Sequence, residues 1–340
     1  MNTNLVAIDL AKKYFQVCVL EGQTVLSNRR LTRLTFQRFI QQLPPTTIAM
    51  ESCASAHYWG RTLQAVGHRV LLVPPQHAKA FRRVHKSDQH DALSIAEAAM
   101  RPNIHFVPVK SQAQQDLQLM GRIRERLTAQ RTAIVNQARG LAREYGVEFP
   151  KQRLVLMRQL PIALEDASND LSTTARQMLH ELLVDLQRMD QRIAALQHDL
   201  DALAQHDPAY ERLRSIPGIG PLVASALLAA MGDGSRFQNG RQAAAWVGLV
   251  PKQNGTGGKV QLLGISKNGN RSLRTLLIHG ARSVLRWADK HNHAQSQWLL
   301  TMVERRGKNR TAVALANKMM RIAWSVITTG ECFDMNKAYA

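Results

Sequence analysis

Residues 5–20 read LVAIDLAKKYFQVCVL, and the two apolar segments in this stretch decide the fold class of the first domain. These segments are Leu5–Asp9 and Tyr14–Leu20, separated by a pair of lysines, and a third segment of the same kind, Thr24–Leu31, follows a glycine. Short runs of apolar and β-branched residues that are bounded by turn residues are typical of strands. The pattern therefore predicts an N-terminal meander of three strands.

Helices and strands are predicted to alternate in the residues that follow. The expected elements are a helix at Thr35–Leu43, a strand at Thr47–Met50, a helix at Tyr58–Val66 and a strand at Arg69–Val73. Doubled prolines follow the first of these helices and the last of these strands, where regular structure should end. This alternation predicts an α/β layer fold for a first domain of residues 1–110.

The second region, residues 111–206, has the composition of long helices. One helix carries apolar residues every seven positions, at Met120, Leu127, Ile134 and Leu141, among many arginines. A second helix has apolar residues at alternating spacings of three and four: Leu179, Leu182, Leu186, Met189, Ile193, Leu196, Leu200 and Leu203. That spacing is typical of a coiled coil, formed within the chain or across a dimer. The alternative is a long amphipathic helix that packs on the core of its own domain.

The third region, residues 207–340, is strongly basic and mostly helical. It contains 19 Lys and Arg against 7 Asp and Glu, a formal charge of +12. It opens with SIPGIG at residues 215–220, a turn before an apolar helix at Pro221–Met231, which resembles a helix–hairpin–helix element. Three more helices are expected at Ser272–Trp287, Ala294–Val303 and Thr311–Thr328.

The charge of the whole chain points to a nucleic-acid partner. The 340 residues carry 45 Lys and Arg against 25 Asp and Glu, a formal +20. Lys and Arg placed on phosphates release condensed counterions, so an excess of this size favours a polyanion. No apolar run approaches the ~20 residues that span a bilayer. The residues MNTNLVAIDL lack the basic segment and apolar core of a secretory signal, so none is expected. Because Cys18, Cys53 and Cys332 form no paired motif, we expect a protein of a reducing compartment, cytoplasmic or nucleoid-associated, without membrane contact.

Four carboxylates stand at positions that suit chemistry. Asp9 ends the first predicted strand and Glu51 ends a later one, while Asp88 and Asp91 share one face at the start of a helix. Each has an ordinary alternative, because acids cap helices and favour helix starts. Carboxylates that lie side by side repel one another unless a cation neutralises them, and hard oxygen ligands select Mg²⁺ or Mn²⁺. Two such ions can hold the attacking and leaving oxygens of a phosphoryl displacement. The four acids therefore predict a metal-dependent site that acts on nucleic acid.

These acids and several separate motifs resemble the DEDD insertion-sequence transposases, the bridge-RNA-guided or seek-RNA-guided recombinases, to which the Piv-type DNA invertases are related. The resemblance covers nearly the whole chain in the expected order. Its motifs are IDLAK at 8–12, SIPGIG at 215–220, AAWVGLVP at 244–251, GG at 257–258 and GISKNGNRSLRTLL at 264–277.

The resemblance implies a fold, partners and a reaction. The fold is an RNase H-like, Holliday-junction-resolvase-like N-terminal domain, then a coiled-coil linker and a mostly helical C-terminal transposase domain. The implied partners are double-stranded donor and target DNA, a structured non-coding guide RNA and further copies of the chain, in a dimer or tetramer. The implied reaction is DNA strand cleavage and exchange.

The family also implies a serine nucleophile shortly after the GL-x-P motif, and here the chain differs. Aligning Gly248–Pro251 with that motif puts Thr256 at the serine's position. A threonine hydroxyl can attack phosphorus if a base or a metal activates it, although its methyl group crowds the approach. The alternatives are Ser266 as the nucleophile, or water on the metals with Thr256 as a turn residue.

Four basic residues near this stretch are candidate phosphate ligands. They are Lys259, Lys267, Arg271 and Arg274, which could neutralise charge in the transition state, although surface cations often serve only solvation. Three classes of function remain open. The resemblance implies an RNA-guided recombinase with a covalent hydroxyl–DNA intermediate, and the residues also allow a metal-dependent nuclease or junction resolvase that uses water, or a non-catalytic nucleic-acid-binding protein.

Overall fold

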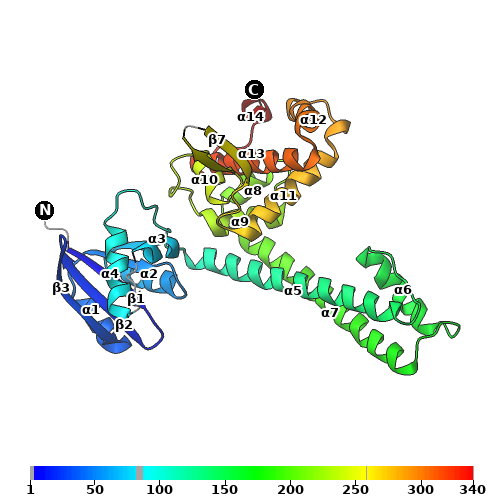
Figure 1. Ribbon diagram of the computed structural model, residues 1–340, viewed down its shortest axis with the longest axis horizontal. Coiled ribbons are helices and arrows are strands. Elements are labelled where there is room, and N and C mark those ends of the chain that lie inside the picture. The colour runs from blue at the N-terminus through cyan, green and yellow to red at the C-terminus, as the bar shows by residue number, and fades with distance from the viewer. Residues whose placement is uncertain (1–3, 82–86, 258, 340) are drawn as a thin grey trace. The chain divides into compact units, whose positions relative to one another are not determined.

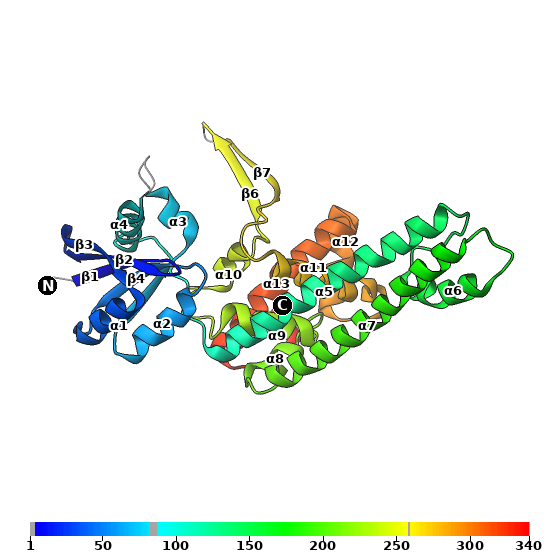
Figure 2. The ribbon, with the colours of Figure 1, turned by 90° about the horizontal axis from the view of Figure 1, so that it is seen from below.

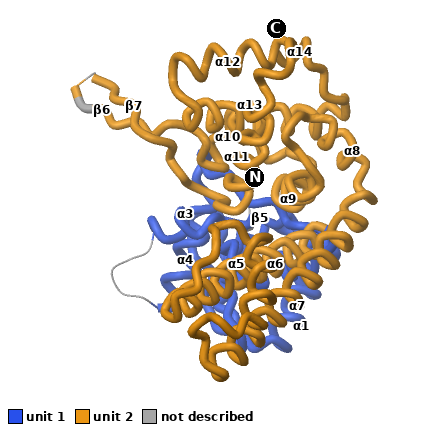
Figure 3. Tube along the Cα trace, turned by 90° about the vertical axis from the view of Figure 1, so that its right-hand side faces the viewer, with its two compact units in different colours: residues 1–113 blue, residues 114–340 orange. Residues whose placement is uncertain are grey.

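The computed structural model describes residues 4–81, 87–257 and 259–339. The chain forms two compact units, Met1–Ala113 and Gln114–Ala340, which are coloured separately in Figure 3. The expected division into domains at 110 and 206 stays a prediction. Within the described residues, no helix is both long enough and apolar enough to cross a membrane.

The first unit is built on a mixed five-stranded sheet (Figure 1). Its strands are β1 (Asn4–Leu10), β2 (Tyr14–Glu21), β3 (Thr24–Thr32), β4 (Thr47–Glu51) and β5 (Arg69–Val73). The order is β3-β2-β1-β4-β5; the first three form an antiparallel meander, and β4 and β5 run parallel to β1. The predicted meander and the alternating elements after it are confirmed.

Helices cover both faces of this sheet. The helices of this unit are α1 (Arg33–Gln42), α2 (Ala56–Ala65), α3 (Pro75–Ala80) and α4 (Asp88–Ala99). On one face, Phe36 of α1 and Trp59 of α2 pack with Phe15, their ring centroids 4.6–5.3 Å apart. The other face is covered by α3 and α4, whose small apolar residues, Ala92 among them, pack against Ala7 and Ala49. Alternation along β1 and β4 thus sends even-numbered and odd-numbered residues to different layers.

The second unit is helical apart from one hairpin. Its first part contains α5 (Gln112–Arg143), α6 (Arg153–Glu165) and α7 (Thr173–Ala204), with α5 and α7 side by side in Figures 1 and 2. The remainder contains α8 (Ala209–Arg214), α9 (Pro221–Met231), α10 (Gly240–Trp246), β6 (Pro251–Thr256), β7 (Lys259–Ile265), α11 (Arg271–Arg286), η1 (Ala288–Lys290), α12 (Ala294–Arg306), α13 (Lys308–Thr329) and α14 (Met335–Tyr339).

The leucine stripe of α7 is buried along one of its two rows. Leu179, Leu186, Ile193 and Leu200 are buried, whereas the alternate positions are only half-buried. In the N-terminal half of α7, Leu179 and Leu186 pack with apolar residues of α5 and α6. Arg131 of α5 also forms a 2.8 Å ion pair with Asp190 of α7. The buried row therefore finds its partner within the chain, while coiled-coil geometry and pairing across a dimer stay predictions.

Candidate active site

Asp9 and Glu51 lie at the same end of two neighbouring parallel strands. Ile8 of β1 is paired with Met50 of β4, so the next position along each strand is one of the two acids. Both continue the odd-numbered row that contains Ala7 and Ala49, and their side chains are therefore directed to the face covered by α4. Asp9 does not cap a helix, because β1 continues to Leu10 and the chain then turns into β2, which begins at Tyr14.

Both of these acids affect the thiol of Cys53. Burial raises the pKa of the Cys53 thiol, and the carboxylates of Glu51 and Asp9 raise it further, since both disfavour a neighbouring thiolate. One thiol therefore senses both charges. From the sequence Cys53 was used only to judge cysteine pairing, although its position two residues after Glu51 was a signal that it lies near the acids.

Helix α4 brings the other two acids to the same face of the sheet. Asp91 lies in its first turn and is 7% exposed, while Asp88 is its first residue and is exposed. Ser87 caps the helix, because its side chain accepts a hydrogen bond from the His90 backbone N–H. The N-cap of α4 is therefore Ser87, and neither Asp88 nor Asp91 has the capping role that was the alternative for them.

A chain of hydrogen bonds fixes the start of α4 above the sheet. Gln16 is paired with Asp9 across β1 and β2 and is 5% exposed. Its amide donates to Asn28 Oδ1 on β3 at 2.7 Å, and Asn28 Nδ2 donates to the Gln89 carbonyl at 3.0 Å. The backbone between Asp88 and Asp91 is thereby tied to the strands at the level of Asp9.

The structure brings the acids to one face but does not gather them into a formed metal centre. Among the residues described, no three His, Cys, Asp or Glu side chains lie close enough together to hold a metal ion. The donor set itself fits a hard divalent cation, because all four predicted ligands offer carboxylate oxygens. Asp9 and Glu51 are placed to begin such a site, and Asp91 is buried on the helix that covers them.

Thr256 ends a strand that the sequence analysis did not predict. The stretch expected to be a glycine-rich loop forms the antiparallel pair β6 and β7, in which Thr256 is paired with Lys259. The hairpin extends away from the helices of its unit in Figure 2, and Val260 and Leu262 are 67% and 62% exposed. Thr256 therefore lies at the tip, and the placement of its side chain lies outside what the structure describes.

Two motifs meet at the base of this hairpin. Gly248 and Gly269 both have positive φ, and a Cβ on either would overlap backbone atoms of the other motif's segment. The Ser266 and Lys267 N–H groups donate to the carbonyls of Val250 and Gly248 at 2.8 and 3.2 Å. The spacing of the GL-x-P and GISKNG motifs is thus explained by close packing of two backbones.

The predicted phosphate ligands divide into two groups. Lys259, Lys267 and Arg271 are exposed around the hairpin and at the start of α11. Arg274 is 8% exposed, and its guanidinium donates to the carbonyls of Val247 and Asn268 at 2.9 and 2.8 Å. Its charge is therefore directed inward, where it joins the two segments at the base of the hairpin.

Replacing Gly269 with Ala is expected to destabilise the second unit by about 3 kcal/mol or more. The new Cβ would meet the Trp246 carbonyl oxygen at a φ of +70°, which side chains rarely adopt. Urea unfolding followed by circular dichroism measures the loss. Gly264→Ala is the matched control, because it has no positive φ and no heavy atom within 4 Å of its added Cβ. Equal midpoints for both variants would contradict the packing described.

The SIPGIG turn is fixed mainly by packing. It joins α8 to α9, and Gly218 has a φ of +89°. A Cβ on Gly218 would lie 2.9 Å from the Gly280 carbonyl oxygen of α11. Gly220, in contrast, faces open space at the start of α9. One glycine of the motif thus permits helix packing, and the other leaves the start of α9 accessible.

Comparison with known proteins identifies the family. Residues 210–297 match the Transposase IS116/IS110/IS902 family, and residues 6–147 match the DEDD transposase domain of the IS110 type. A probable family 20 transposase of Pseudomonas aeruginosa is 44% identical over 98% of this chain and 99% of its own length. The transposase for insertion sequence element IS1111A of Coxiella burnetii is 39% identical over 97% of this chain and 91% of its own.

A more distant relative has a name that refers to gene inversion. The pilin gene-inverting protein of Moraxella bovis is 23% identical over 98% of each chain. The DEDD domain implies an RNase H-like fold, in keeping with the mixed sheet of the first unit. The chain belongs to the IS110/IS116 family of DEDD transposases, and it is a DNA transposase or recombinase.

Proposed function

We propose that this transposase is an RNA-guided recombinase that cleaves and exchanges DNA strands through a covalent Thr256–DNA intermediate. The observation that supports a catalytic site in the first unit is the placement of Asp9 and Glu51 on adjacent parallel strand ends, on the face covered by the helix of Asp88 and Asp91. Asp9, Glu51, Asp88 and Asp91 would hold Mg²⁺ or Mn²⁺, which supplies positive charge for the oxygens of the scissile phosphate.

The proposed reaction keeps the number of ester bonds to phosphorus constant. The Thr256 oxygen forms a bond to phosphorus while the bond from phosphorus to a deoxyribose oxygen breaks, and the proton of the hydroxyl passes to solvent or to the leaving oxygen. Because the energy of the broken bond is kept in the threonyl ester, a second DNA strand can attack it without an external energy source. This is the reason to prefer a covalent route for strand exchange over hydrolysis.

Features of the second unit support this role for Thr256. It lies at the tip of an extended hairpin, whereas Ser266 lies at the base, where its Oγ accepts a hydrogen bond from the Asn268 N–H at 3.4 Å. The four acids belong to the other unit. We propose that the hairpin reaches acids of its own or another copy in a dimer or tetramer bound to donor DNA, target DNA and a structured guide RNA at the nucleoid.

A trapping assay with the wild-type protein tests this function. Protein purified with its co-expressed RNA is mixed with end-labelled donor and target DNA in Mg²⁺ and separated on a denaturing gel. A protein–DNA band is expected that disappears when the metal is chelated or when the RNA is removed. Cleaved DNA without such a band would indicate hydrolysis by water, and the nuclease would replace the recombinase. A band that persists without RNA would overturn the guided mechanism alone.

A further inference from the structure

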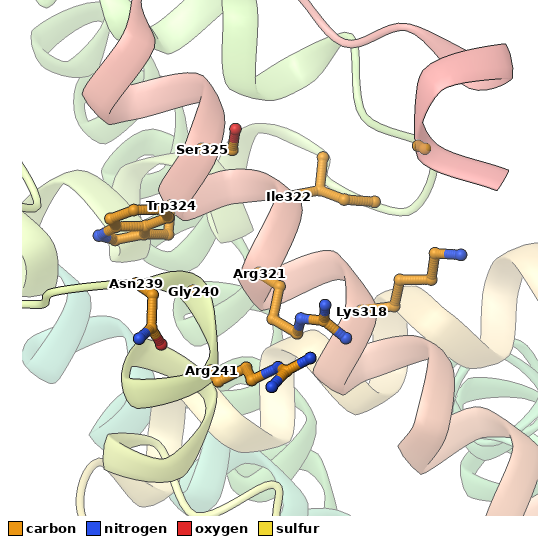
Figure 4. Close-up of a pocket in the computed structure, with 9 residues that line it drawn as sticks. Asn239, Gly240, Arg241, Lys318, Arg321, Ile322, Trp324 and Ser325 are labelled. Carbon is orange, nitrogen blue, oxygen red and sulfur yellow. The ribbon is translucent and has the colours of Figure 1, made fainter. Parts of the chain in front are cut away.

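A basic pocket lies between α10, α13 and α14 of the second unit, apart from the hairpin (Figure 4). Its volume is about 410 Å³. The residues that line it include three cations and no acid: Asn239, Gly240, Arg241, Lys318, Arg321, Ile322, Trp324, Ser325 and Ala338. A hollow of this size is large enough for a phosphate group with part of its sugar.

Two of the cations line the pocket from neighbouring helices. In Figure 4 the side chains of Arg241 and Arg321 extend from α10 and α13 into the space between these helices, and Lys318 extends from α13 one turn earlier. Across the described part of the chain, none of these three residues forms an ion pair with a carboxylate. Like charges that line one pocket repel one another, and an anion bound among them removes the repulsion.

The backbone holds this arrangement in place. Gly240 is buried at the start of α10, and a Cβ on it would lie 3.0–3.1 Å from the carbonyl oxygen, Cα and Cβ of Arg321. A glycine here lets α10 approach α13 closely, so the backbone of Arg241, the next residue, lies near that of Arg321. The presence of both cations at one pocket therefore results from helix packing.

Lys318 is partly buried near the positive charge of Arg321. Burial lowers the pKa of its ammonium group, and the neighbouring charge of Arg321 lowers it further. Its Nζ lies 3.8 Å from the centroid of the Tyr339 ring, which holds the side chain beside the pocket. A bound anion would reverse the unfavourable effect of Arg321 on Lys318.

We propose that this pocket binds a backbone phosphate of nucleic acid, with Arg241 and Arg321 as a paired clamp and Lys318 adding charge. Planar guanidinium groups match the oxygens of a phosphate with paired hydrogen bonds. The inference rests on the proposed function only in that the protein holds nucleic acid, and it adds a contact site separate from the exposed cations Lys259, Lys267 and Arg271 around the hairpin. DNA and RNA offer the same phosphodiester, so both are probes in the test.

The test measures how binding depends on salt. Fluorescence anisotropy gives Kd for a labelled 30-base-pair DNA duplex and for a labelled structured RNA between 50 and 300 mM KCl. Arg241→Gln with Arg321→Gln is expected to weaken one of the probes about tenfold at 150 mM salt and to lower its salt slope by about one. Arg241→Lys with Arg321→Lys keeps the charge, so it should restore most of the slope. The probe that responds identifies the nucleic acid that occupies the pocket.

A matched control removes the same charge elsewhere on the surface. Arg305 on α12 and Arg310 on α13 are exposed and lie outside the pocket, so Arg305→Gln with Arg310→Gln should change each Kd less than twofold. Equal losses in the two double variants, or no loss in the pocket variant, would overturn the clamp. If the wild-type protein bound neither probe, the proposed function itself would fail, which separates the two results.

Discussion

Thr256→Ala is expected to abolish the covalent protein–DNA product and to lower strand exchange by about 10³-fold or more, because it removes the attacking oxygen. Thr256→Ser should keep the product, since it keeps the hydroxyl and removes only the methyl group that crowds the approach. The residue lies at the end of β6, where the backbone is already paired with β7, so neither substitution should change the melting temperature. Denaturing gels of the trapped product and a rate for joint-strand formation measure both effects.

Ser266→Ala is the control for this experiment. Ser266 is the other hydroxyl considered in this part of the chain, and it lies at the base of the hairpin. Its replacement should leave the trapped band in place. A band lost in Ser266→Ala and retained in Thr256→Ala would transfer the nucleophile to Ser266. If neither variant lost the band, the nucleophile would lie outside this hairpin.

Asp9→Asn is expected to reduce DNA cleavage by about 10³-fold while the Kd for DNA stays within about twofold of wild type. Asparagine has nearly the same shape, so β1 and its pairing with Gln16 on β2 should persist. What is lost is one negative charge at the strand end beside Glu51, and with it most of the attraction for a divalent cation. Single-turnover cleavage over a range of Mn²⁺ concentrations should show a higher half-saturation for the variant.

Glu21→Gln provides the matched control. Glu21 is the last residue of β2 and is paired with Asn4, at the end of β1 opposite to Asp9. The substitution therefore removes the same charge from the same sheet, away from the acids. Its cleavage rate should be unchanged. If Asp9→Asn cleaved as fast as Glu21→Gln, the carboxylates would have no catalytic role, and a non-catalytic nucleic-acid-binding unit would explain the first domain.

The parts of the candidate site that could be predicted share a local cause. Asp9 and Glu51 each follow a run of buried apolar residues, and in a parallel pair such run ends meet at one edge of the sheet. Asp88 and Asp91 are one helical turn apart, so their shared face needed no tertiary information. Even so, only the fold shows that α4 covers the face to which the odd-numbered residues of β1 and β4 are directed.

Other features depend on contacts between one segment of the chain and another. The stretch around Thr256 looked like a loop because its glycines dominate the local signal, yet Lys259–Ile265 supplies a second strand for it to pair with. Arg274 looked like a surface cation, whereas its two bonds to carbonyls turn it inward. The side chain cannot be assigned to either role before the backbone around it is known.

Sequence alone determined the order of the strands and of the helices other than α3 in the first unit, the strand-end and helix-start positions of the four acids, and the basic character of the chain. Each of these follows from local periodicity or from composition, which the folded state does not alter. Tertiary structure decided which helix covers the acids, how the leucine row of α7 is buried within the chain, and how Arg241 and Arg321, 80 positions apart, come to line one pocket. Those contacts depend on how helices pack, and packing depends on the shapes of surfaces that no single segment contains.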